Sequence, residues 1–225
     1  MFYQRVRFPG HKLVLASCVK NDPAIRFGNR TAIDIIEHFK GNDDHKIIVD
    51  VGGNVGSVAV IVGLVLNNVQ IFVAEPHPDC YKALLENIKR NKLENTIFPF
   101  NVAIGSSFNF INKSNKVNSG VCVTSSSGDV STHHKVKSMS LNDLVLKAGS
   151  VDVLKMDVEG AEYRIFSEFT LWDRIKSYHL EFHDIPLEDK NSVDGDLVRK
   201  RLFNKISEHS TFVKEVPKTA MGRLL

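Results

Sequence analysis

The chain has 225 residues with a net charge of +3, an isoelectric point near 8.7, 43% hydrophobic residues and 24% charged residues. This composition indicates a globular protein that can bury its own core, without the run of ~20 apolar residues that a membrane span requires. The basic residues are scattered and the three cysteines lack disulfide-framework or zinc-cluster spacing, so we expect a cytoplasmic protein with no nucleic-acid partner.

The N-terminal part is expected to be an extension, residues 1–44, that packs on a core domain spanning residues 45–225. Within it, Lys12-Leu-Val-Leu-Ala-Ser-Cys18 ends in a cysteine preceded by small residues, as a lipoprotein signal would. Its apolar run is shorter than the ~7–15 residues of a signal sequence. We interpret this stretch as an early strand or loop.

From His45 onward, β-rich segments alternate with helical patterns, which is typical of a parallel sheet with helices on both faces. The predicted strands are 46–50, 69–74, 96–104, 151–157, 177–183 and 211–216, with 221–225 as a candidate for a last strand. The predicted helices are 56–67, 78–91, 161–169 and 196–209. The helix at 56–67 is so rich in β-branched residues that tertiary packing has to hold it.

The segment 106–134 is rich in serine and asparagine and is predicted to be a loop or ragged hairpin inserted into the domain. Its position between a strand and the following part of the chain is compatible with a lid over a site. A plain loop explains the composition equally well.

The sharpest motif is Asp50-Val-Gly-Gly-Asn-Val-Gly56, which follows a strand and precedes a helix. Its glycines allow a tight turn, and the helix N-terminus offers free N–H groups. A dinucleotide fingerprint would need glycines where Asn54 and Ser57 stand. The loop therefore suits a cofactor with a charged amino-acid end, and Glu75, which closes the next strand, suits ribose hydroxyls. A tight turn with a surface glutamate is the alternative.

Three charged residues mark the end of the strand predicted at 151–157. Lys155, Asp157 and Glu159 share one face if the extended geometry continues. Charges at the carboxyl end of a buried strand are costly unless they are paired or used. Both a catalytic role and a structural Lys155–Asp157 ion pair are open.

The strand predicted at 177–183 carries His179, Glu181 and His183 on one face. The two histidines are ~13 Å apart along a strand and cannot share one metal ion. Glu181, His183 and Asp157 could form a metal site, but we favour His183 as a metal-free acid/base residue because an unperturbed imidazole titrates near neutrality.

Several of these motifs together resemble the FkbM family of S-adenosylmethionine-dependent (SAM-dependent) methyltransferases. The segments that carry the resemblance are 49–56, 74–78, 85–87 with Asn91, 151–162 and 180–183. The block Lys-x-Asp-x-Glu-Gly-x-Glu within 151–162 is quite specific to this family. Gly53 stands where the family usually has alanine, a mild departure that should not harm cofactor binding.

The resemblance implies a Rossmann-like α/β fold, the seven-stranded class I methyltransferase sandwich. It also implies methyl transfer from SAM to, typically, a hydroxyl oxygen on a sugar, lipid or secondary-metabolite-like acceptor. The alternatives are an NAD-dependent Rossmann oxidoreductase and an inert cofactor-binding module. The absence of a Tyr-x-x-x-Lys pair argues against the oxidoreductase, and the intact acidic residues argue against the inert module.

The predicted site residues fall into two groups, and no metal ligands are expected. The cofactor group is Asp50, Gly52, Gly53, Asn54, Gly56, Glu75, Pro76, Asn101, Ala103 and Asp157, with 101–104 beside the adenine. The catalytic group is His183, Asp157, Glu181, Lys155 and Glu159.

Overall fold

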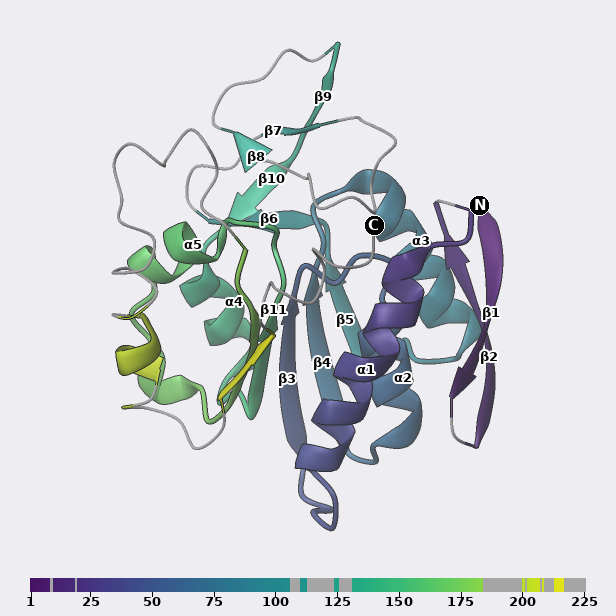
Figure 1. The fold of residues 1–225 in the computed structure, drawn as a ribbon, viewed down its shortest axis with the longest axis horizontal. Coiled ribbons are helices and arrows are strands. Elements are labelled where there is room, and N and C mark those ends of the chain that lie inside the picture. Colours follow the sequence, from purple (N-terminus) through teal and green to yellow (C-terminus); the bar gives the residue numbers. More distant parts are fainter. Residues whose placement is uncertain are drawn as a thin grey trace.

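The computed structural model describes residues 1–8, 10–18, 20–105, 110–112, 124–125, 131–183, 200, 202–206, 208 and 213–216. Its centre is a parallel sheet in the order β13-β12-β11-β3-β4-β5 (Figure 1). Numbered among themselves, these strands follow the order 3-2-1-4-5-6 from β5 to β13, that of a doubly wound fold. The predicted Rossmann-like α/β class is confirmed, with six sheet strands in the described ranges instead of seven.

The main sheet consists of β3 (Lys46–Val51), β4 (Val69–Ala74), β5 (Ile97–Phe100), β11 (Val153–Met156), β12 (Tyr178–Glu181) and β13 (Val213–Val216). The helices are α1 (Pro23–His38), α2 (Ser57–Val65), α3 (Pro78–Arg90), α4 (Leu141–Ala148), α5 (Glu162–Glu168) and the short 3-10 helix η1 (Trp172–Arg174). The smaller strands are β1 (Phe2–Phe8), β2 (His11–Ser17), β6 (Val102–Ile104), β7 (Phe110–Asn112), β8 (Thr124–Ser125), β9 (His133–Lys135) and β10 (Lys137–Met139).

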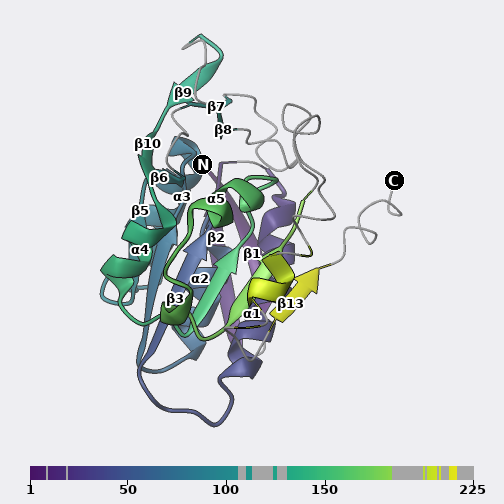
Figure 2. The ribbon, with the colours of Figure 1, turned by 90° about the vertical axis from the view of Figure 1, so that its left-hand side faces the viewer.

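Helices cover both faces of the sheet, as predicted (Figures 1 and 2). Successive side chains of a strand point to opposite faces, so Ile48 lies in one hydrophobic cluster and Val49 in the other. The first cluster joins the sheet to α1, α2 and α3, and the second joins it to α4 and α5. The strands are therefore buried on both sides, which explains their continuous apolar sequences.

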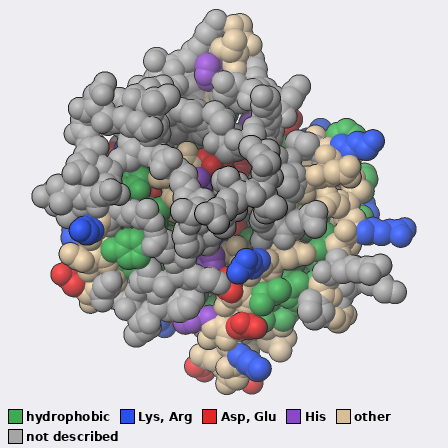
Figure 3. All heavy atoms as spheres, in the orientation of Figure 1, with side chains coloured by type: hydrophobic (Ala, Val, Ile, Leu, Met, Phe, Trp, Pro, Cys, Tyr) green, Lys and Arg blue, Asp and Glu red, His purple; other side chains and the backbone are tan. Residues whose placement is uncertain are grey.

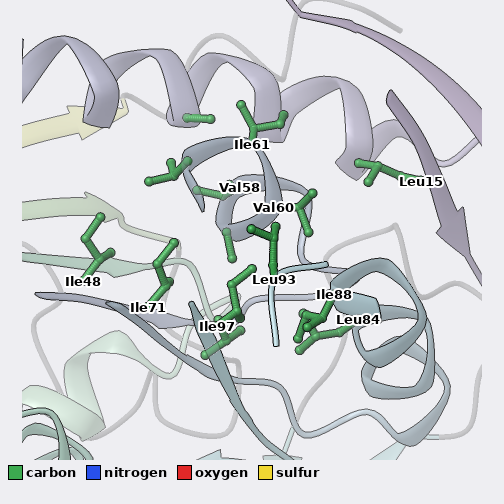
Figure 4. Close-up of a cluster of buried hydrophobic side chains, with 14 of the residues drawn as sticks. Leu15, Ile48, Val58, Val60, Ile61, Ile71, Leu84, Ile88, Leu93 and Ile97 are labelled. Atoms are coloured by element: carbon green, nitrogen blue, oxygen red, sulfur yellow. The ribbon is translucent and has the colours of Figure 1, made fainter. Parts of the chain in front are cut away.

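The β-branched helix α2 is held by tertiary packing, as the sequence required. Val58, Val60 and Ile61 are all buried, because α2 lies between the sheet and α1 (Figure 4). A helix that is apolar on all sides is stable in such a position. Sequence analysis did not predict α1, which provides the outer cover.

An antiparallel hairpin of β1 and β2 precedes α1 and lies beside α3 (Figure 1). Of the strand and the loop considered for 12–18, the structure shows the strand, as β2. The fully buried side chain of Asn87 on α3 accepts from the backbone N–H of Ala16 at 2.6 Å. The same amide donates to the carbonyls of Ala16 at 2.9 Å and Val55 at 2.8 Å, which ties the hairpin to the glycine loop.

The single strand predicted at 96–104 is wrong, because the chain leaves the main sheet at Asn101. Here β5 ends, at the edge of the main sheet with β4 as its one neighbour. Pro99 lacks a backbone N–H, which an edge strand can tolerate on the side that no other strand pairs with. The Asn101 side chain donates to the carbonyls of Glu75 at 2.9 Å and Pro76 at 3.2 Å. After this break, β6 pairs with β10 in a separate two-stranded sheet.

The predicted insertion at 106–134 contains the strands β7, β8 and most of β9, which form a small antiparallel sheet. This agrees with the hairpin alternative, whereas 106–109, 113–123 and 126–130 lie outside the described residues. Residues 202–206 are helical and β13 matches the strand predicted at 211–216. The strand predicted at 221–225 also lies outside the described part.

Among the helices that the structure describes, none is long and apolar enough to cross a membrane.

We expect Asn87→Ala to destabilise the protein by about 3 kcal/mol, because one buried N–H and two buried carbonyls lose their partner. Chemical denaturation measures this loss. Asn91→Ala on the same helix is the control, since its amide makes one hydrogen bond, to the Asn87 carbonyl. Equal effects of the two substitutions would contradict the tie between hairpin and loop.

Candidate active site

The predicted site residues gather at one edge of the sheet, where the carboxyl ends of β3, β4, β5, β11 and β12 meet. Ligands bind at this edge in open α/β sheets, next to the point where the strand order reverses. That point lies between β3 and β11. Acidic side chains and a histidine are visible in the upper middle of the face in Figure 3, above these strand ends.

A buried ion pair joins the two strands at this switch point. The ammonium group of Lys155 on β11 lies 3.0 Å from a carboxylate oxygen of Asp50 on β3, with both side chains nearly inaccessible. The same ammonium donates to the carbonyl of Gly52 at 3.0 Å. Burial alone would lower the pKa of Lys155, but the carboxylates of Asp50 and Asp157 raise it. Lys155 is therefore paired with Asp50, not with Asp157 as one interpretation of the sequence had it.

The glycine loop packs directly against the end of β11. Gly52 has a φ of 80°, and a Cβ atom there would collide with the backbone carbonyl of Asp157. A Cβ atom at Gly53 would collide with a methyl group of Val73 on β4. The Val73 methyl group therefore fills the space that an alanine side chain at position 53 would occupy. Gly56 follows as the N-cap residue of α2.

Glu75 follows β4 and links the glycine loop to the start of α3. Its buried carboxylate accepts from the backbone N–H of Asn54 and from that of His77, each at 2.7 Å. Burial outweighs these hydrogen bonds and raises the pKa of Glu75 to about 7. The acid predicted at this position thus lies beside the loop as expected.

Several buried oxygens around the loop fit a polar ligand. Apart from the ion pair with Lys155, the carboxylate of Asp50 makes no hydrogen bond within the described structure, and the side-chain oxygen of Asn54 has no partner there either. Buried polar atoms without partners are rare in folded proteins. Together with the Glu75 carboxylate, they offer acceptors for an amino group and for ribose hydroxyls.

A cluster of carboxylates surrounds His183 at the ends of β11 and β12. Its Nε2 atom lies 3.1 Å from Glu159, 3.8 Å from Glu181 and 3.9 Å from Asp157. Its Nδ1–H donates to Glu162 at 2.8 Å. The structure thus brings together every residue of the predicted catalytic group except Lys155.

The cluster changes the charge expected for its histidine. Burial alone would lower the pKa of His183, but the hydrogen bond to Glu162 and the charges of Glu159 and Asp157 raise it to about 9. Burial also raises the pKa of Glu159 to about 7. His183 is therefore mostly an imidazolium at neutral pH, and Glu159 is the group that titrates there. Glu159 also has a φ of 55°, which is rare for a residue other than glycine.

Sequence analysis missed Glu162 as a site residue. Its side chain is fully buried, although the sequence places it only at the end of the Lys-x-Asp-x-Glu-Gly-x-Glu block. An acidic residue in the first turn of a helix directly after a charged cluster was the available indication.

Of the residues predicted beside adenine, Ala103 is buried in β6 opposite Ser138, and Asn101 contacts the carbonyls of Glu75 and Pro76.

Two groups of ligand-type side chains are close enough to share an ion: His77 with Asp79 and His134, and Asp157 with Glu159 and His183. Proximity is the only observation for either group. We therefore assign no metal site.

A doubly wound sheet, a glycine loop at its switch point and a ribose-type acid after the second strand define a nucleotide-cofactor-binding α/β enzyme fold. The sequence model of the methyltransferase FkbM domain matches residues 50–212, which is more than half of the chain. The chain belongs to the FkbM family of SAM-dependent methyltransferases. The predicted family, and with it the cofactor SAM, is confirmed.

Solved structures with a similar fold include TYW2 from P. horikoshii in complex with MeSAdo, at 22% identity and a TM-score of 0.33 over 45% of this chain and 36% of that one. TYW2 from M. jannaschii in complex with AdoMet has 24% identity and a TM-score of 0.32 over 44% and 42%. The human methyltransferase 10 domain containing protein has 14% identity and a TM-score of 0.43 over 84% and 75%. This chain thus spans less than half the length of either TYW2 structure. None of the curated proteins matches the chain significantly.

We expect Gly52→Ala to lower the affinity for SAM more than tenfold, because the new Cβ displaces either the loop or the turn at Asp157. Isothermal titration calorimetry with SAM measures the change. Gly149→Ala is the matched control, since Gly149 also has a positive φ but no atom within 4 Å of the added Cβ. Both variants carry backbone strain because alanine disfavours a positive φ, and only Gly52→Ala should lose binding.

Proposed function

We propose that this protein transfers the methyl group of SAM to a hydroxyl oxygen on a sugar, lipid or secondary-metabolite-like acceptor. The observation that carries the proposal is the contact between the glycine loop and Asp157. It places the cluster around His183 next to the loop that the family uses for its cofactor. This closeness supports the proposal, because proton-accepting groups would then lie near the methyl donor and the acceptor hydroxyl.

The cofactor side of the site is formed by the glycine loop and the segments after β4, β5 and β11. SAM, when bound, supplies a methyl group that its sulfonium already activates, so the protein has to align the reactants and exclude water. The residues proposed to hold it are Asp50, Gly52, Gly53, Asn54, Gly56, Glu75, Pro76, Asn101, Ala103 and Asp157. Among them, Glu75 has the carboxylate for the ribose hydroxyls.

On the acceptor side, Glu159 is proposed to take the proton that the hydroxyl loses as its C–O bond forms. Its pKa of about 7 makes it a base that is available near neutral pH. The His183 imidazolium, 3.1 Å away, neutralises part of the charge that accumulates there. Asp157 and Glu181 complete the group and can accept hydrogen bonds from further hydroxyls of the acceptor.

The charge of the cluster favours an uncharged acceptor. Four carboxylates, from Asp157, Glu159, Glu162 and Glu181, face the single imidazolium of His183. Such a site repels the phosphates of a nucleic acid. Carboxylates instead accept hydrogen bonds from hydroxyl groups, which agrees with a polyhydroxylated or lipid-like alcohol.

Methyl transfer can be tested with SAM carrying a labelled methyl group and a panel of acceptors that includes glycosides, lipid alcohols, hydroxylated aromatic compounds and RNA. We expect label on an uncharged alcohol and none on RNA. Labelled RNA alone would overturn the acceptor class. Tight binding of NAD in place of SAM would overturn the cofactor assignment.

We expect Glu75→Gln to weaken SAM binding about tenfold at about pH 8, because a charge-assisted pair of hydrogen bonds is lost. The pKa of about 7 means that wild-type Glu75 is ionised at this pH and mostly protonated at about pH 6. Wild-type affinity should therefore fall by about tenfold between these values, whereas the variant should show little change. Calorimetry at both pH values measures this, and an unchanged pH dependence in the variant would refute the ribose role of Glu75.

A further inference from the structure

Glu162 is a fully buried carboxylate that neither the predicted cofactor group nor the predicted catalytic group includes. It is the first residue of α5, with 0% of its surface exposed. One carboxylate oxygen accepts from His183 Nδ1 at 2.8 Å and from the backbone N–H of Val158 at 3.3 Å. The second oxygen is buried without a hydrogen-bond partner in the described part of the chain.

This arrangement fixes the orientation of the imidazole ring. Because Nδ1 has to donate its proton to Glu162, Nε2 points in the opposite direction. There it meets Glu159 at 3.1 Å and also Glu181 and Asp157. Without Glu162, the ring could flip or rotate, and either nitrogen could face the carboxylates.

A purely structural explanation of Glu162 is weak. A buried carboxylate costs several kcal/mol in desolvation, and its pairing with a neighbour is often no better for stability than apolar residues of similar size. The hydrogen bond to Val158 closes a turn that an uncharged glutamine could close equally well. What only the charged group provides is a strong hold on the cationic ring.

We infer that Glu162 is a positioning residue, which holds His183 by Nδ1 so that Nε2 faces the carboxylates that receive the acceptor hydroxyl. This inference rests on the proposed function of the same site. Among the hydrogen bonds and ion pairs of the described residues, Glu162 contacts His183 and the backbone of Val158, and its charge adds to the rise in the pKa of Glu159 and of Glu181. Its one side-chain hydrogen bond within the cluster is to His183, so the orientation of that ring is what Glu162 controls directly.

The test uses Glu162→Gln, which keeps the size of the side chain and an oxygen that can accept from Nδ1. NMR of the His183 ring, assigned by comparison with a His183→Asn variant, follows its titration without any acceptor. We expect the pKa of His183 to fall by at least about one unit, a tenfold loss of proton affinity. The same change should bring the alkaline limb of the kcat profile to lower pH and reduce kcat about 10–100-fold, with SAM affinity unchanged within about twofold.

The matched control is Glu168→Gln, the same substitution at the exposed end of the same helix, which should alter neither the titration nor kcat. Unchanged His183 titration and kcat in Glu162→Gln would overturn the inference. If that variant does not fold, NMR of the neutral tautomer of His183 in the wild-type protein tests the inference instead. A proton on Nδ1 supports the hydrogen bond to Glu162, and a proton on Nε2 would overturn it. A shifted titration in a protein that methylates no acceptor would instead count against the proposed function alone.

Discussion

The buried ion pair between Lys155 and Asp50 is the interaction on which the site depends. Neither charge could stay inside the protein alone, since removing one partner of such a pair costs about 3–5 kcal/mol. The pair fixes the strands on either side of the switch point, and Lys155 also holds the carbonyl of Gly52. The position of the glycine loop therefore follows from the alignment of two strands that are about a hundred residues apart in the sequence.

The other site residues form two groups, one on each side of this ion pair. On the side of β4 and β5, backbone N–H groups and amide contacts bring Glu75, Asn54 and Asn101 together. On the side of β11 and β12, carboxylates gather around one imidazole. The two halves touch where Gly52 meets Asp157. The two halves are thus built from different strands and joined through a contact that leaves no room for a side chain.

The elements that could be predicted from the sequence are those with a local cause. Continuous apolar runs gave the bounds of β3 and β4 almost to the residue, and the glycine spacing located the loop. The pairing of Lys155 with Asp50 could not be predicted, because it depends on the register between β11 and β3. Likewise, the break after β5 depends on contacts between Asn101 and residues about 25 positions earlier, while the apolar pattern itself runs on.

The close approach of Gly53 to Val73 has an evolutionary consequence. A methyl group of Val73 occupies the space that the alanine side chain common in the family would need. The two positions are therefore epistatic: alanine at 53 requires a side chain smaller than valine at 73, and valine at 73 requires glycine at 53. Grafting valine alone at position 73 into a relative with alanine at position 53 would therefore damage the loop that both surround, whereas glycine alone at position 53 would create no clash.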